Sequence, residues 1–208
     1  MSQYSVFEEK INIYSHVFGM FLGLIGLVLL VAKSFGDYNL VSGVSFVIFG
    51  LSIVSLYFAS ARYHSAVDER LRFRRKILDH SAIYILIAGT YTPYALASIG
   101  GSVGWVIFGV SWLLALIGFI LKIFFTGQFK VLSTSMYVLM GWMVVFFINP
   151  LMKALPHEGF VWLLLGGISY TIGAVLYSIK KIKLNHAIFH IFVLAGTICH
   201  FLSIYLYI

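Results

Sequence analysis

The chain contains, at residues 185–200, the sequence NHAIFHIFVLAGTICH, which places His186 and His190 four residues apart within an apolar run. On an α-helix, residues at i and i+4 lie on the same face, about 6 Å apart along the axis. Two imidazoles arranged in this way can bind one metal ion, whereas each would otherwise be an unpaired polar group in an apolar environment. The run therefore predicts a membrane-spanning helix with two metal ligands, and the rest of the chain must supply a third.

The composition is that of an integral membrane protein. Hydrophobic residues make up 61% of the chain and charged residues 10%, with a mean hydropathy of +0.99, whereas about half of the residues of a soluble domain are apolar. Seven apolar segments are long enough to cross about 30 Å of hydrocarbon as helices. Continuous runs such as Ile83–Ala88 lack the alternation of β-barrel strands. The sequence predicts an all-α, seven-transmembrane helix bundle as one domain over residues 1–208, with spans at about 13–32, 41–61, 79–99, 103–121, 131–150, 159–179 and 186–207.

Lysine and arginine are distributed unevenly between the two sides of the predicted bundle. With the N-terminus inside, the cytoplasmic segments hold twelve of the fourteen: Lys10, Arg62, Arg70, Arg72, Arg74, Arg75, Lys76, Lys122, Lys130, Lys180, Lys181 and Lys183. The positive-inside rule therefore predicts a cytoplasmic N-terminus and a C-terminus outside. The basic loop 62–78 serves as a topology anchor, with binding of anionic headgroups as the alternative. Since these segments carry the basic residues, the net charge of +7 does not indicate a nucleic-acid partner.

The predicted topology brings five of the seven histidines to one depth, near the cytoplasmic surface. They are His16, His64, His80, His186 and His190. Asp79 lies at the same depth, at the start of the third predicted span. Ionisable side chains at membrane depth are costly to bury, so this group indicates a functional site.

His64 is the best-placed third ligand, because it directly follows the second span and Ser60 lies one turn above it. Three histidine nitrogens with an open fourth position are typical of catalytic zinc, whereas structural zinc has four protein ligands. Zinc lowers the pKa of bound water to about 7, which would allow Asp79 to act as general base and then acid. Ser60 could orient a ligand or donate to a developing oxyanion. The alternative is a set of hydrogen bonds between helices, and three imidazoles also bind other divalent ions.

Three polar residues precede the first span or lie at its start. Glu9, Asn12 and His16 occur at i, i+3 and i+7, which places them on one face of a helix. This spacing predicts that they brace the metal ligands from the first span. The alternative is an ordinary polar entry to a membrane helix.

The motifs occur in a fixed order along the chain. They are Glu9-xx-Asn12-xxx-His16 at the first span, Ser60-xxx-His64 at the second, Leu78-Asp79-His80-Ser81 and Gly89-Thr90-Tyr91-Thr92-Pro93 at the third, and His186-xxx-His190 at the seventh. The ordered set resembles the hemolysin III family, which belongs to the progestin and AdipoQ receptor (PAQR) group and to a superfamily that includes alkaline ceramidases. The resemblance covers essentially the whole chain and includes features of the bacterial branch. It implies a zinc ion held by His64, His186 and His190, near Asp79 and Ser60, in a bacterial plasma membrane.

The resemblance suggests three functions: hydrolysis of a membrane-lipid amide or ester, a non-enzymatic membrane-homeostasis or receptor-like role, and cytolysis through a pore. A pore needs polar faces on several helices, and a span such as Val103–Leu121 has almost none. A receptor leaves the open zinc position unexplained unless a ligand carboxylate fills it. Hydrolysis uses the metal, the water, the base and an apolar cavity for an acyl chain. We therefore expect a zinc-dependent hydrolase, with membrane lipid as its substrate.

Overall fold

The computed structural model describes residues 4–36 and 39–208, which are entirely helical apart from turns and loops. Seven helical segments in this part of the chain are long and apolar enough to cross a membrane. The elements are α1 (Val6–Ser34), α2 (Leu40–His64), α3 (Glu69–Pro93), η1 (Tyr94–Ile99), α4 (Gly101–Phe125), α5 (Lys130–Gly141), η2 (Trp142–Phe147), α6 (Ile148–Ala154), α7 (His157–Ser178) and α8 (Asn185–Tyr207). The third span joins α3 to η1, and the fifth runs from α5 through η2 into α6. The predicted all-α, seven-span class is confirmed.

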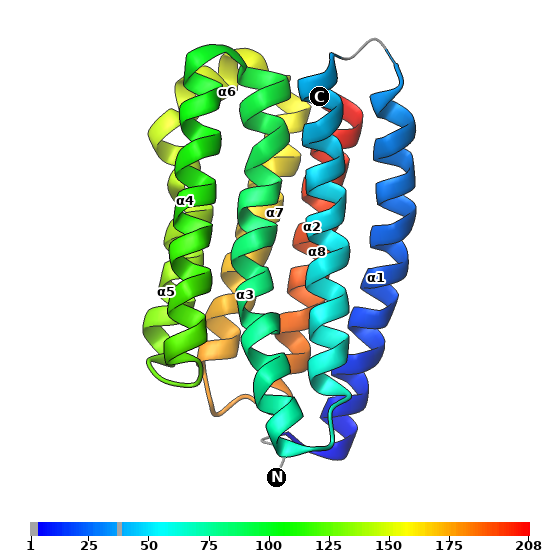
Figure 1. Cartoon of the computed structure of the whole chain (residues 1–208), viewed down its shortest axis with the longest axis vertical. Coiled ribbons are helices and arrows are strands. Elements are labelled where there is room, and N and C mark those ends of the chain that lie inside the picture. The colour runs from blue at the N-terminus through cyan, green and yellow to red at the C-terminus, as the bar shows by residue number, and fades with distance from the viewer. Residues whose placement is uncertain (1–3, 37–38) are drawn as a thin grey trace.

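The spans run up and down beside one another (Figure 1). Helix α1 packs against α2 and α8, α2 packs against α3, and α7 packs against α8. Helix α1 begins and α8 ends at opposite ends of the bundle, as an odd number of crossings requires (Figure 1). We call the end where α1 begins the basic end, because it also holds the α2–α3, α4–α5 and α7–α8 connections. Most lysines and arginines lie in the α7–α8 connection or in the helix turns next to the three connections. That the basic end faces the cytoplasm remains a prediction from the charge distribution.

Two helices begin earlier than the apolar segments that predicted them. Helix α3 begins at Glu69, because the side chain of Asp68 accepts a hydrogen bond from the Leu71 N–H at 2.8 Å and caps the helix. Asp79 therefore lies within the helix, about 15 Å along it, and does not open it. Helix α1 begins at Val6 in the same way, with Ser5 as its cap. Hydropathy located the membrane-embedded part of these helices but not their polar first turns.

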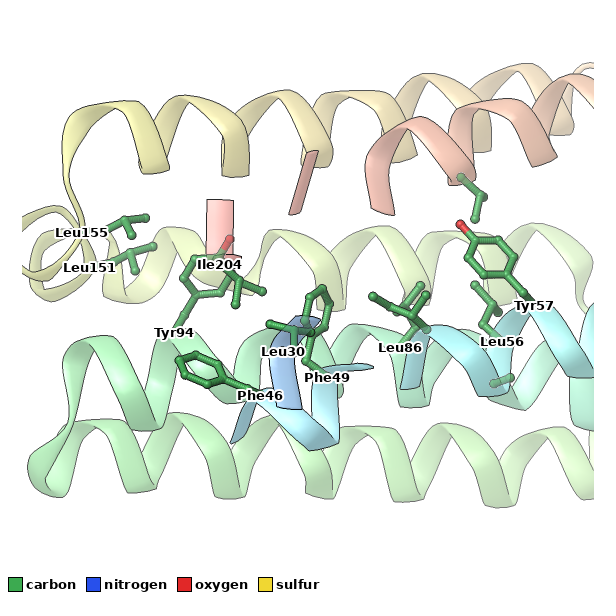
Figure 2. Packing of buried hydrophobic residues seen from close by; sticks show 13 residues of the cluster. Leu30, Phe46, Phe49, Leu56, Tyr57, Leu86, Tyr94, Leu151, Leu155 and Ile204 are labelled. Atoms are coloured by element: carbon green, nitrogen blue, oxygen red, sulfur yellow. The ribbon is translucent and has the colours of Figure 1, made fainter. Parts of the chain in front are cut away.

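The centre of the bundle is a cluster of apolar side chains that joins several spans (Figure 2). Leu30, Phe49, Leu86 and Ile204 come from α1, α2, α3 and α8, and each is buried. Tyr57 on α2 belongs to the same cluster, and its hydroxyl donates to Thr197 Oγ1 on α8 at 2.9 Å. These side-chain contacts link α2 to α8, and these two helices carry the three histidines predicted to bind metal.

Small residues allow α7 and α8 to approach closely, and substitutions at two adjacent glycines on α7 can test this. A β-carbon at Gly166 would collide with the His200 ring and lie 3.1 Å from the Gly196 carbonyl oxygen, whereas at Gly167 the nearest side-chain atom is 3.9 Å away. We expect Gly166→Ala to destabilise the bundle by about 1–3 kcal/mol through overpacking. Gly167→Ala should be neutral or stabilise by up to about 1 kcal/mol. Thermal unfolding of both variants in detergent measures the difference, and equal melting temperatures would contradict the close approach.

Candidate metal centre

Three buried imidazoles meet at the basic end of the bundle. His64 is the last residue of α2, and His186 and His190 lie on the first turns of α8. One ligand atom from each residue lies within 4.8 Å of the others, so the group could hold a metal ion. The two Nε2 atoms of His64 and His186 are 3.1 Å apart. Tetrahedral zinc with Zn–N bonds of about 2.0–2.1 Å separates its ligand nitrogens by about 3.3 Å, so this pair fits one ion.

Each of the three rings has an oxygen partner at its other nitrogen. His64 Nδ1 lies 2.6 Å from Glu9 Oε2, His186 Nδ1 lies 2.9 Å from Tyr4 Oη, and His190 Nδ1 lies 3.4 Å from Ser15 Oγ. Partners of this kind are typical of metal-binding histidines, because an Nδ1–H that donates to oxygen leaves the Nε2 lone pair for the ion. All three partners come from the first fifteen residues of the chain.

The paired Nε2 atoms provide a test of whether a cation fits the site. In the tautomer that donates Nδ1–H to Glu9 and Tyr4, the rings of His64 and His186 direct two lone pairs at each other across 3.1 Å. Two lone pairs at this distance repel unless a cation lies between them. The donor set of three nitrogens in a buried site suits zinc or a similar divalent ion.

Glu9 is held in the site by a second interaction. Its Oε1 accepts a hydrogen bond from Arg72 on α3, while its Oε2 faces His64. Arg72 also donates to the Ala66 carbonyl at 3.1 Å and stacks on the Tyr63 ring, 4.8 Å from its centroid. A buried carboxylate needs a partner, and Arg72 supplies one and orients Glu9 toward His64. Arg72, predicted to lie in a basic loop that anchors the topology, thus lies on α3 and makes a specific contact.

The other two residues of the predicted brace also contact the ligands. Asn12 is fully buried, and its Nδ2 lies 3.4 Å from His64 Nδ1. His16 stacks on His190 with ring centroids 3.5 Å apart and an angle of 11° between the planes. Neither ring nitrogen of His16 has a hydrogen-bond partner within the described chain. His16 therefore contacts the site through its ring face.

Asp79 and Ser60 lie beside the three histidines. Both are buried, and both line the cavity that His186 and His190 also line. The Asp79 carboxyl is close enough to interact with His64 and with the Ser60 hydroxyl. Ser60 Oγ nevertheless makes no well-formed hydrogen bond to any described residue. Asp79 does not belong to the group of converging metal-binding atoms, so the carboxylate is free for another task.

The cavity next to the histidines is long, narrow and mostly apolar. Its volume is about 220 Å³, and it is lined at the basic end by Tyr177 and His186 and further along by Leu151, Phe160 and His200. His186 and His200 are separated by about 21 Å of helix rise on α8. A cavity of this shape suits one extended hydrocarbon chain whose polar end reaches the histidines.

Two histidines outside this cluster have ordinary roles. His200 Nε2 donates to the Leu163 carbonyl oxygen at 3.1 Å, which joins α8 to α7. His157 is exposed at the start of α7. The structure therefore brings together the histidines of α1, α2 and the start of α8 and keeps these two apart. His80 on α3 lies beside Asp79, with its Nε2 3.9 Å from Asp79 Oδ2.

Sequence reasoning missed Tyr4, Ser15 and Arg72. A tyrosine before the first span and a serine within a helix are common residues, and neither is charged near neutral pH. The sequence did contain a hint of Arg72, because a glutamate predicted to lie in a buried site needs a basic residue as its partner. The spacing of Ser15, three residues after Asn12, was a weaker signal for the same helix face.

Comparisons with known proteins match nearly the whole chain to one family. The family described as "Haemolysin-III related" matches residues 4–201. The chain is 40% identical over 204 residues to the "Hemolysin-3 homolog" of Bacillus subtilis (strain 168), covering 98% of this chain and 96% of that protein. It is 39% identical over 208 residues to "Hemolysin-3" of Bacillus cereus, and 25% identical over 212 residues to the human "Monocyte to macrophage differentiation factor". These matches cover 100% and 97% of this chain, and 94% and 85% of the two relatives. No solved structure matches significantly.

Proposed function

The chain belongs to the haemolysin-III related family of multi-pass membrane proteins, and from this premise we propose that it is a zinc-dependent hydrolase of a membrane lipid. One observation carries the proposal. His64, His186 and His190 converge beside an apolar cavity, and each ring has an oxygen partner at Nδ1, which leaves Nε2 for an ion when Nδ1 carries the proton. Zinc bound by three histidines would act as a Lewis acid on a carbonyl group. It would also lower the pKa of a bound water molecule to about 7.

The neighbouring side chains can supply the rest of the reaction. The Asp79 carboxylate takes a proton from water as the water oxygen bonds to the carbonyl carbon of the lipid. The Ser60 hydroxyl, which has no well-formed hydrogen bond in the described chain, donates to the carbonyl oxygen as negative charge develops on it. Asp79 then returns the proton to the leaving amine or alcohol as its bond to the carbonyl carbon breaks. The products are a fatty acid and the deacylated lipid.

The apolar cavity favours hydrolysis over a lytic pore. It offers space for one acyl chain next to the histidines, and its lining is mainly apolar and aromatic. Two relatives have names that refer to hemolysis. A water-filled pore needs polar helix faces, whereas α4 presents mainly apolar side chains such as Val106, Leu113 and Ile117 to its surroundings. We therefore expect no dye leakage from vesicles that contain the purified protein.

Lipid turnover by purified protein tests the proposal directly. The protein in lipid nanodiscs is incubated with ceramide, with diacylglycerol and with phosphatidic acid, and fatty-acid release is followed by mass spectrometry. Release should stop on treatment with a chelator and return when zinc is added. Turnover that persists after removal of the metal would contradict the zinc dependence. A zinc-loaded protein that releases no fatty acid from any of these lipids would contradict hydrolysis.

Glu9, the partner of His64 at Nδ1, provides a prediction about zinc affinity. We expect Glu9→Gln to weaken zinc binding by about 10–100-fold, because the amide is a poorer acceptor for the His64 Nδ1–H and no longer pairs with Arg72. Competition with a chelating dye measures the affinity. Glu8→Gln is the matched control, since it removes the same charge one residue away. Equal affinities for the two variants would contradict the role assigned to Glu9.

A further inference from the structure

A second polar cluster lines the same cavity and has no role in the proposed reaction. It consists of Lys76 on α3, Lys122 on α4, and Ser133 and Thr134 on α5. These helices meet beside the histidines at the basic end of the bundle, on the side away from α1 (Figure 1). The cluster places two ammonium groups and two hydroxyls at the wall of a cavity that also contains Asp79 and His186.

Lys122 is the unusual member of this cluster. It is only 4% exposed, although lysines near the ends of membrane helices usually extend to water. Its Nζ donates to Ser133 Oγ at 2.7 Å and lies 5.4 Å from the centroid of the Tyr137 ring. Both partners are uncharged, and no carboxylate in the described chain forms an ion pair with it. A buried ammonium group without an anion is costly, so the site is suited to an anion from outside the chain.

Lys76 lies near both Lys122 and the histidine site. It is close enough to interact electrostatically with Lys122, and also with Asp79 and His186. It also reaches the α4–α5 connection, since a β-carbon at Gly127 would lie 4.0 Å from Lys76 Nζ. The two ammonium groups thus share one wall of the cavity, next to the residues proposed to cleave the lipid.

We propose that Lys76, Lys122, Ser133 and Thr134 form a subsite for the phosphate headgroup of an anionic lipid whose acyl chain occupies the apolar part of the cavity. Lysine ammonium groups and hydroxyls are common donors to phosphate oxygens, and charge-assisted bonds of this kind are stronger in an environment of low dielectric. The subsite selects phospholipids over neutral lipids. As a statement about the substrate it rests on the proposed hydrolysis, but as a binding site it can be tested separately.

Two lipids that differ only in the phosphate provide the test. Binding of dioctanoyl phosphatidic acid and of dioctanoylglycerol to the full-length protein in detergent is measured by native mass spectrometry, with the metal removed by a chelator. We expect the phosphate lipid to bind about 10–100-fold more tightly, which corresponds to one or two charge-assisted hydrogen bonds. The double variant Lys76→Gln, Lys122→Gln should reduce this ratio to near one, and Lys122→Arg should keep most of it.

Lys181→Gln is the matched control, because it removes the charge of an exposed lysine in the α7–α8 connection at the same end of the bundle. It should leave the preference unchanged. A preference that survives in the double lysine variant would overturn the subsite, as would equal binding of the two lipids to the unaltered protein. If inorganic phosphate binds as tightly as phosphatidic acid, the site recognises free phosphate and the lipid assignment is wrong. None of these outcomes depends on turnover, so a protein that hydrolyses nothing can still support the subsite.

Discussion

Replacement of His190 by alanine is expected to abolish tight zinc binding and lipid hydrolysis while the seven-helix bundle remains folded. The ring of His190 is one of three whose ligand atoms lie within 4.8 Å of one another. Two histidine nitrogens hold zinc more weakly than three. The loss of zinc affinity should exceed the roughly 10–100-fold expected when a hydrogen-bond partner of a ligand, such as Glu9, is replaced.

Elemental analysis after dialysis measures this effect, with about one zinc ion per chain expected for the unaltered protein and almost none for His190→Ala. Zinc should raise the melting temperature of the unaltered protein, because an ion that binds only the folded state stabilises it by about 2.7 kcal/mol at a concentration of 100 Kd. The variant should show no such rise. His200→Ala is the control on the same helix, since His200 bonds to the Leu163 carbonyl and lies outside the converging group. A His190→Ala protein that retains one zinc ion per chain would exclude the three-histidine site.

The sequence predicted that His64, His186 and His190 come together, because helix spacing and the order of the membrane crossings were enough to place them. His186 and His190 share a helix face because of their spacing. The order of the spans places His64, at the end of the second, on the same side of the membrane as the start of the seventh. The contacts that orient the rings could not be predicted in this way. Tyr4 and His186 are 182 positions apart in the sequence, and their hydrogen bond depends on how the start of the chain packs under α8.

The polar starts of the helices escaped prediction for a related reason. Hydropathy detects the segment that contacts hydrocarbon, whereas a helix begins where a side chain caps its first free N–H groups. The Asp68 cap extends α3 ten residues beyond the predicted start, and this extension carries Arg72 to Glu9 and Lys76 to the cavity wall. Both residues were assigned only to a basic loop. Their positions in the folded chain suggest specific roles.

Helix α1 joins the candidate metal site to the rest of the bundle. The residues that orient the three rings, Tyr4, Glu9 and Ser15, lie on α1 or directly before it, although α1 provides none of the three converging ligands. Metal binding should therefore stabilise the packing of α1 against α2 and α8. Conversely, a change that loosens α1 should weaken metal binding without altering a ligand.

Asp79→Asn is expected to leave the metal in place and to slow lipid hydrolysis by about 10²–10⁴-fold, the usual contribution of a general base or acid. Asparagine has almost the same shape as aspartate, so it fits the buried site next to Ser60 and His64. Its amide cannot take a proton from water or return one to the leaving group. Because the Asp79 carboxylate lies outside the group of converging ligand atoms, its replacement should change zinc affinity only slightly.

The matched comparison for this variant is Ser60→Ala, which removes a hydroxyl that makes no well-formed hydrogen bond in the described chain. It should slow turnover by up to about 10²–10³-fold, the cost of one oxyanion donor, again with zinc retained. Single-turnover release of fatty acid and zinc content should be measured on the same samples, so that loss of chemistry and loss of metal are separated. If Asp79→Asn loses its zinc together with its activity, Asp79 is a metal ligand. If it hydrolyses lipid at the normal rate, the proton passes through another group, and His80 beside it becomes the first residue to replace.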